Sequence, residues 1–135
     1  MDEPSRPPED REGAYELFQR GLALLRGRHH AQAAVVLERA ARAEPGKGSI
    51  VEALGRAYFN AGQHDRSLEA FERLLEIDPS SPYGHFGVGQ SLKRLGRSAE
   101  ARTHLRLAVA LEPGSALYRN ALARLGPEPA RPPTD

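Results

Sequence analysis

The stretch GHFGVGQSLKRLG holds the first residues whose types and spacing suggest chemistry. Gly84, Gly87 and Gly89 fall within six residues, and Lys93 follows them. Glycine-rich loops that open a helix can bind nucleotide phosphates through backbone N–H groups. A dinucleotide loop needs a preceding strand, and a P-loop lysine needs a glycine before it and a serine or threonine after it. Neither context is present, so we expect Gly89 to serve helix packing.

The five histidines raise the question of a metal site. His29 and His30 are adjacent, and His64 follows His30 by 34 residues. Adjacent histidines cannot both face one ion from a regular helix, and the sequence has no His-x3-His or Glu-x-x-His pair. We expect solvated turn residues at these three positions and a packed side chain at His85. The absence of cysteine excludes disulfides and thiolate metal sites.

Composition gives no sign of catalysis or of an extended charged surface. No nucleophilic residue is spaced so that it would pair with a general base. The sequence therefore predicts no catalytic residue, no cofactor and no enzyme. A net charge of +1 gives no overall attraction to nucleic acid or membrane. The N-terminus lacks the basic start and apolar core of a secretory signal, and no apolar run is long enough to span a membrane. We expect a cytoplasmic protein.

The elements that position these residues repeat at a fixed interval. The segments RAEPGK, EIDPSS and ALEPGS place Pro45, Pro79 and Pro113 at a spacing of 34 residues. A shift by this period aligns small and large residues in the same order, which predicts closely packed helices. The aligned sets are Gly21, Gly55 and Gly89; Leu24, Tyr58 and Leu92; Ala33, Ser67 and Ala101; Leu37, Phe71 and Leu105; and Ala40, Leu74 and Ala108.

Each repeat unit is predicted to form two antiparallel helices. Tight turns are expected near Gly27, Gly62 and Gly96, and each second helix stops before a proline that cannot continue it. Ser81, which precedes a proline, and Ser115 are typical N-caps for the helices that follow.

This pattern resembles the tetratricopeptide repeat (TPR) family, whose repeat has the pattern W-x2-L-G-x2-Y…A-x3-F…P. The second repeat carries Leu54, Gly55, Tyr58, Phe71 and Pro79 at the matching positions. The resemblance implies an all-α solenoid of three helix–turn–helix repeats over residues 14–47, 48–81 and 82–115. It also implies a capping helix over residues 116–126. We expect the Pro-rich ends, residues 1–13 and 127–135, to be disordered.

The resemblance implies a concave groove, lined by the first helix of each repeat, where peptides bind. We expect this groove to be apolar at its N-terminal end and aromatic and basic toward its C-terminal end, with Glu52 as the exception. Helix packing leaves Gly84 and Gly87 unexplained; they are either neutral or clear room for a partner's backbone. The expected groove residues are Tyr15, Phe18, Leu22, Leu25, Glu52, Arg56, Phe59, Asn60, Tyr83, Phe86, Gln90, Lys93, Arg94, Asn120 and Arg124.

Some TPR domains hold the acidic C-terminus of heat-shock chaperones with a clamp of Lys and Asn residues. On the family's pattern the clamp positions fall on residues that are neither Lys, Arg nor Asn, which argues against that role here. These positions are Phe18, Leu22, Ala53, Tyr83 and Gly87.

Three function classes follow from the resemblance. The first is a non-enzymatic adaptor or scaffold whose groove binds a protein segment with apolar anchors and acidic residues. The alternative is a self-associating structural protein, in which the N-terminal apolar stripe forms a homodimer or is covered by the N-terminal tail. RNA binding is the third class, and it needs a basic excess that a net charge of +1 does not supply.

Overall fold

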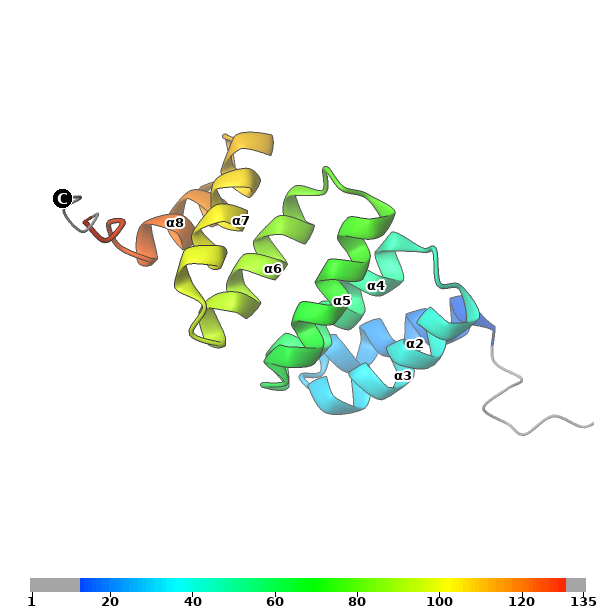
Figure 1. Ribbon diagram of the computed structural model, residues 1–135. Helices are drawn as coiled ribbons and strands as arrows, with labels where there is room; N and C mark the ends of the chain where they lie inside the picture. Colours follow the sequence, from blue (N-terminus) through cyan, green and yellow to red (C-terminus); the bar gives the residue numbers. More distant parts are fainter. Residues whose placement is uncertain (1–12, 131–135) are drawn as a thin grey trace, which may run out of the picture.

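The computed structural model describes residues 13–130, and this part of the chain is a solenoid of seven helices. The predicted all-helical fold is therefore confirmed. In Figure 1 the helices lie side by side in chain order, from α2 and α3 at one end to α7 and α8 at the other. The helices are α2 Ala14–Arg26, α3 His30–Ala43, α4 Gly48–Asn60, α5 His64–Ile77, α6 Pro82–Arg94, α7 Ser98–Leu111 and α8 Ala116–Arg124.

Each helix packs mainly on its neighbours along the chain, and the first helices of successive repeats also contact one another (α2 with α4, and α4 with α6). The core accordingly consists of clusters that share elements along the stack: one joins α2, α3 and α4 with Ala70 of α5, and the next joins α4, α5 and α6 with Ala101 of α7. A third cluster joins α6, α7 and α8. This nearest-neighbour packing is typical of repeat proteins.

The repeating glycines lie where two helices of one repeat approach most closely. A Cβ built on Gly89 would lie 2.8 Å from Leu105 Cδ2 and 3.2 Å from the backbone oxygen of Ala101. A Cβ built on Gly55 would similarly lie 2.7 Å from Cζ of Phe71. The glycine and its large partner are 16 residues apart in both repeats, so Gly89 serves helix packing as predicted.

Gly84 and Gly87 also serve packing, which corrects the expectation that packing leaves them unexplained. A Cβ on Gly84 would lie 2.7 Å from Leu75 Cδ2, and a Cβ on Gly87 would overlap the Phe71 ring. Both contacts join α6 to α5, the helix before it. The aligned positions of the other repeats are not glycine, so the 34-residue period did not indicate these two contacts.

A buried hydrogen bond accompanies this close approach. The hydroxyls of Ser67 on α5 and Ser91 on α6 lie 2.8 Å apart, and Ser67 also donates to the carbonyl of His64. Both serines are fully buried. The pair explains why serine replaces the alanine found at the first of these positions in the other repeats, since each hydroxyl satisfies the other.

The two predicted serine caps are present. Ser81 Oγ accepts a hydrogen bond from the backbone N–H of Gly84 at 2.9 Å, and Ser115 Oγ accepts one from Tyr118 at 3.3 Å. At the end of α8, the buried Arg102 of α7 donates to the carbonyl of Gly126 at 2.9 Å. A cation at a helix C-terminus is favourable because the last carbonyls lack intrahelical partners.

Most of the predicted tails lies outside the described residues, namely residues 1–12 and 131–135. Residues 127–130 are described and lie against α7. Arg106 forms an ion pair with Glu128 at 3.2 Å, and Arg102 donates to the carbonyl of Pro127 at 3.4 Å.

The turn inside each repeat requires one left-handed residue. Gly62 and Gly96 have φ of 79° and 80°, and the equivalent residue of the first repeat is Arg28, with φ of 63°. The predicted turn glycine, Gly27, instead has an ordinary φ of −82°. All three turns close with the same backbone bonds; in the first, His29 N–H donates to Leu24 O at 2.8 Å.

We predict that Arg28→Gly stabilises the protein. The left-handed conformation costs an L-residue about 1–2 kcal/mol, whereas the extra backbone entropy of an unfolded glycine costs about 0.5–1 kcal/mol. A net gain of about 0.5–1 kcal/mol is expected from urea denaturation. The reverse change at the equivalent turn, Gly62→Arg, should lose a similar amount, and a loss in Arg28→Gly would contradict the strain argument.

Candidate functional site

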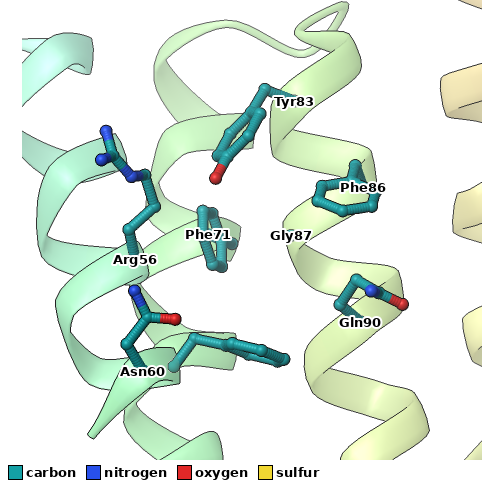
Figure 2. A pocket seen from close by; sticks show the side chains of 8 residues that line it. Arg56, Asn60, Phe71, Tyr83, Phe86, Gly87 and Gln90 are labelled. Carbon is teal, nitrogen blue, oxygen red and sulfur yellow. The ribbon is translucent and has the colours of Figure 1, made fainter. Parts of the chain in front are cut away.

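A pocket of about 180 Å³ opens between α4 and α6, on the face formed by the first helices of repeats two and three. Figure 2 shows Arg56 and Asn60 on one helix, Tyr83, Phe86 and Gln90 on the helix facing it, and the Phe71 ring between them. The full lining is Arg56, Phe59, Asn60, Phe71, Tyr83, Phe86, Gly87 and Gln90.

Helical periodicity explains why these side chains converge. Arg56, Phe59 and Asn60 are spaced i, i+3 and i+4 on α4, so they share one face of that helix. Tyr83, Phe86, Gly87 and Gln90 are spaced i, i+3, i+4 and i+7 on α6 and share one face in the same way.

Phe71 forms the floor of the pocket from α5. Its ring is 2% exposed and lies between two glycines, Gly55 on α4 and Gly87 on α6. Because neither glycine has a side chain, α4 and α6 both reach the ring, and the ring remains visible at the bottom of the space between them (Figure 2).

Aromatic rings continue from this floor toward the end of the stack. The Phe71 and Tyr83 ring centroids are 5.9 Å apart, and those of Tyr83 and Phe86 are 5.6 Å apart. Phe86 contacts Tyr118 of α8 at 5.2 Å. These are tilted arrangements within the range that aromatic pairs favour, so the wall of the pocket is made of rings that fix one another.

The rim of the pocket is polar: Arg56, Asn60 and Gln90 form it, and a second cation, Arg94, lies beside it. The guanidinium of Arg94 lies 5.6 Å from the centroid of the Phe59 ring, a cation–π distance. Arg56 lines the pocket itself and lies one turn after Glu52 on α4. Burial raises the pKa of the Glu52 carboxyl, and the charge of Arg56 offsets part of the rise.

The size and lining of the pocket decide what it can hold. An apolar cavity of about 150 Å³ holds benzene, whereas drug-sized ligands occupy about 300–1,000 Å³. The pocket therefore fits one apolar or aromatic side chain. Arg56, Asn60 and Gln90 at its edge can bind carboxylate and backbone groups next to that side chain.

Six of the predicted groove residues line this pocket, and two lining residues were missed. The six are Arg56, Phe59, Asn60, Tyr83, Phe86 and Gln90. Phe71 was missed because it lies on a second helix at a core position. Its signal was its size, since the other repeats have leucine at that position. Gly87 was missed because a residue without a side chain contributes only space.

The predicted residues further along the stack lie outside the pocket lining. Lys93 is half-buried and Arg94 is exposed at the end of α6, and Asn120 and Arg124 are exposed on α8.

The predicted N-terminal stripe does not line this pocket. Tyr15 is 71% exposed, and with the half-buried Phe18 it borders a separate hollow of about 60 Å³ beside the connection from α3 to α4. Leu22 is half-buried.

Leu25 is a correction. It is only 8% exposed and belongs to the core cluster that joins α2, α3 and α4, so it is not a groove residue. Leu24, expected in the core, is half-buried instead. Its equivalent Tyr58 contacts the preceding repeat through Glu38 of α3 at 2.6 Å, a contact that a first repeat lacks.

The histidines differ in part from their prediction as solvated turn residues. His29 is exposed, but His30 and His64 are half-buried and their Nδ1 atoms are shielded from solvent. His64 packs edge-on against Phe59, with ring centroids 5.0 Å apart. His85 is packed as expected; its Nδ1 lies 3.1 Å from Nδ1 of His104.

When both rings are neutral, the bond between His85 and His104 has one consistent proton arrangement. His85 Nε2 lies 2.9 Å from the carbonyl of Pro79 and must donate to it, so His85 Nδ1 accepts from His104 Nδ1–H. Burial lowers the pKa of His104, and so does the positive charge that His85 carries when it is protonated. Across residues 13–130, no three His, Cys, Asp or Glu side chains come together as metal ligands.

Comparison with known proteins identifies the family. Two tetratricopeptide repeat models match residues 18–82 and 61–125. The chain therefore belongs to the tetratricopeptide repeat family. It is 34% identical over 109 residues to mouse Superkiller complex protein 3. The aligned region covers 81% of this chain and 7% of that protein. The chain thus spans less than a tenth of the length of this relative.

Solved structures show the same fold. The first TPR domain of Spaghetti bound to an HSP90 peptide matches with a TM-score of 0.79 at 17% identity, over 83% of this chain and 89% of that one. The Yersinia enterocolitica chaperone SycD in complex with a peptide of the translocator YopD matches with a TM-score of 0.72 at 19% identity, over 82% and 85% of the two chains. Within the part of the chain that is described, none of the helices has the length and apolar character needed to cross a bilayer.

Proposed function

We propose that this protein is a non-enzymatic adaptor that binds a protein segment in the pocket between α4 and α6. The observation that carries the proposal is a side-chain-sized aromatic pocket with hydrogen-bonding groups at its rim. Two structural neighbours hold peptides, an HSP90 peptide and a YopD peptide, which supports a peptide as the class of ligand. The bound segment would place an apolar anchor against Phe71 and an acidic residue beside Arg56.

A displayed library of random nonapeptides, selected on the immobilised protein, tests this proposal. Enriched peptides should share an apolar anchor. Asn60→Trp, at an exposed position on the rim, should fill the entrance and weaken the best peptide at least about tenfold, or about 1.4 kcal/mol. Gln32→Trp places the same side chain at an exposed position on α3 and should leave affinity unchanged. Equal binding by both variants would contradict the proposed site.

Self-association is the second candidate, and the observation that favours it is the 71% exposure of Tyr15. Sedimentation equilibrium separates the two candidates. An adaptor with an open groove should sediment as a monomer. A dimer that Tyr15→Ser dissociates would instead support self-association through the N-terminal end.

A further inference from the structure

Glu52 is half-buried on α4, one turn before the pocket residue Arg56. Residues four apart share one face of a helix, so Glu52 lies on the same face of α4 as Arg56, beside the pocket. Burial raises the pKa of Tyr83 on α6 and of Tyr118 on α8, and the negative charge of Glu52 adds to the rise in both. The helical phase, with which this electrostatic effect agrees, puts the Glu52 charge on the face of α4 that packs toward α6.

Within the described part of the chain, Glu52 has no hydrogen-bond or ion-pair partner. Glutamate followed by arginine four residues later is a favourable pairing on a helix, yet Glu52 and Arg56 form no ion pair; Arg56 lines the pocket instead. A partly desolvated carboxylate without a partner costs free energy. The groove thus presents two separate charges of opposite sign, one turn apart.

We propose that Glu52 selects a partner segment that carries a basic residue as well as an acidic one beside its apolar anchor. This inference rests on the proposed function and adds the basic residue to the partner's chemistry. In an extended segment, side chains two positions apart lie on the same side, about 6.6–6.8 Å from each other. That distance is similar to the spacing of about 5–6 Å between neighbouring positions on one helix face. A Lys or Arg two residues from an Asp or Glu can therefore meet Glu52 while the acid meets Arg56.

The same charge argues against a wholly acidic partner. An acidic residue placed opposite Glu52 would meet a like charge in a partly desolvated site, and like-charge contacts reject wrong partners more strongly than matching ones add affinity. Arg56 alone would accept any acidic segment, whereas Glu52 and Arg56 together require opposite charges in a fixed order. The expected partner, a segment with apolar and acidic residues, must therefore also carry a basic residue.

The test repeats the nonapeptide selection on wild-type protein and on Glu52→Gln, with Glu76→Gln as the matched control at an exposed position of α5. Wild type and Glu76→Gln should enrich peptides with an anchor, an acid and a base. Glu52→Gln should keep the anchor and the acid and lose the base. Enrichment without a basic residue on wild type, or an unchanged basic preference on Glu52→Gln, would overturn the inference and leave the proposed function intact. If the wild type enriches no peptides beyond those that Asn60→Trp enriches, both the inference and the proposed function are wrong.

An affinity measurement on one peptide pair makes the test quantitative. The best wild-type peptide and a copy with norleucine in place of its basic residue should differ about tenfold on wild type and less than about twofold on Glu52→Gln. Preference for the basic peptide should also fall as pH falls through the raised pKa of Glu52, because a neutral carboxyl cannot pair with a cation. If replacing the basic residue weakens binding equally on wild type and on Glu52→Gln, the inference is wrong.

Folding of the Glu52→Gln variant is not at risk. Since the folded-state pKa is raised, the ionised carboxylate opposes folding at neutral pH, and stability is lost as pH rises through that pKa. The glutamine should therefore equal or exceed wild type in a thermal melt at pH 7.

Two other occupants of the groove are outcomes of the same measurements. A synthetic peptide of residues 1–12, which contains acidic residues and Arg11, is added as a competitor. If the competitor displaces the selected peptide at micromolar concentration, the chain's own segment fills the groove. The inference of an external partner would then be wrong. A dimer in sedimentation equilibrium that the selected peptide dissociates would show that a second copy occupies the groove, with the same consequence.

Discussion

Phe71→Ala is expected to destabilise the protein by about 3–5 kcal/mol, the usual cost of truncating a buried phenylalanine. Phe71 is 2% exposed, and Cβ atoms built on Gly55 and Gly87 would both fall against its ring, so its removal leaves a gap between α5 and the two helices that carry these glycines. Neither glycine has a side chain that could move into the space. The loss should be measurable by urea denaturation followed by far-UV circular dichroism.

Phe71→Leu is the control for this prediction. Leucine occupies the equivalent positions in the other repeats, as Leu37 and Leu105, so it suits the helix contact in general. We expect a loss of about 1–1.5 kcal/mol, since a smaller side chain of similar polarity leaves only part of the volume empty. The same variant should deepen the pocket between α4 and α6. A loss in Phe71→Ala no larger than in Phe71→Leu would mean that the ring is not central to the contact between α5 and its two neighbours.

The period of the sequence was sufficient to predict the fold. Three prolines at one spacing, with glycines and large residues in phase, define the helix pairs, because each repeat must solve the same packing problem. The turn residue of the first repeat shows the limit of that reasoning. Gly27 was chosen by residue type, whereas the phase of Gly62 and Gly96 points to Arg28, whose φ is positive. Strict use of the period would have found it.

Features that belong to one repeat alone could not be found from the period. Gly84 and Gly87 contact the helix before them, and the other repeats have no matching glycine. The paired Ser67 and Ser91 similarly replace residues that need no partner. Such contacts depend on which residues meet between different repeats, and a sequence compared only with itself does not contain that information.

Helical phase predicted which groove residues share a face, but not the pocket itself. Phase placed Arg56 and Asn60 on one face of α4 and Tyr83, Phe86 and Gln90 on one face of α6. It could not show that the Phe71 ring of α5 reaches the bottom of the space between them, since that depends on the missing side chain of Gly87. The N-terminal stripe lies apart from the pocket because it belongs to α2, whereas α4, α5 and α6 line the pocket, and its last residue, Leu25, is buried in the core.

Gly89→Leu is expected to destabilise the protein by about 3 kcal/mol, at the upper end of the usual range for overpacking. A Cβ at this position would lie 2.8 Å from Leu105 Cδ2 and 3.2 Å from the backbone oxygen of Ala101. The leucine side chain can shift, but the backbone oxygen belongs to the first turn of α7 and cannot move without the helix. The higher helix propensity of leucine returns less than about 1 kcal/mol, so the clash decides the sign.

Gly114→Leu is the matched control, because Gly114 has no neighbouring atom within 4 Å of a built Cβ. Its stability should stay within about 0.5 kcal/mol of wild type. Thermal melts with and without ATP then separate packing from nucleotide binding at Gly89. If the glycines formed a phosphate loop, Gly89→Leu would fold normally, and ATP would stabilise the wild type alone. If they form the contact between α6 and α7, ATP should change neither melt, and Gly89→Leu should unfold earlier than Gly114→Leu under both conditions.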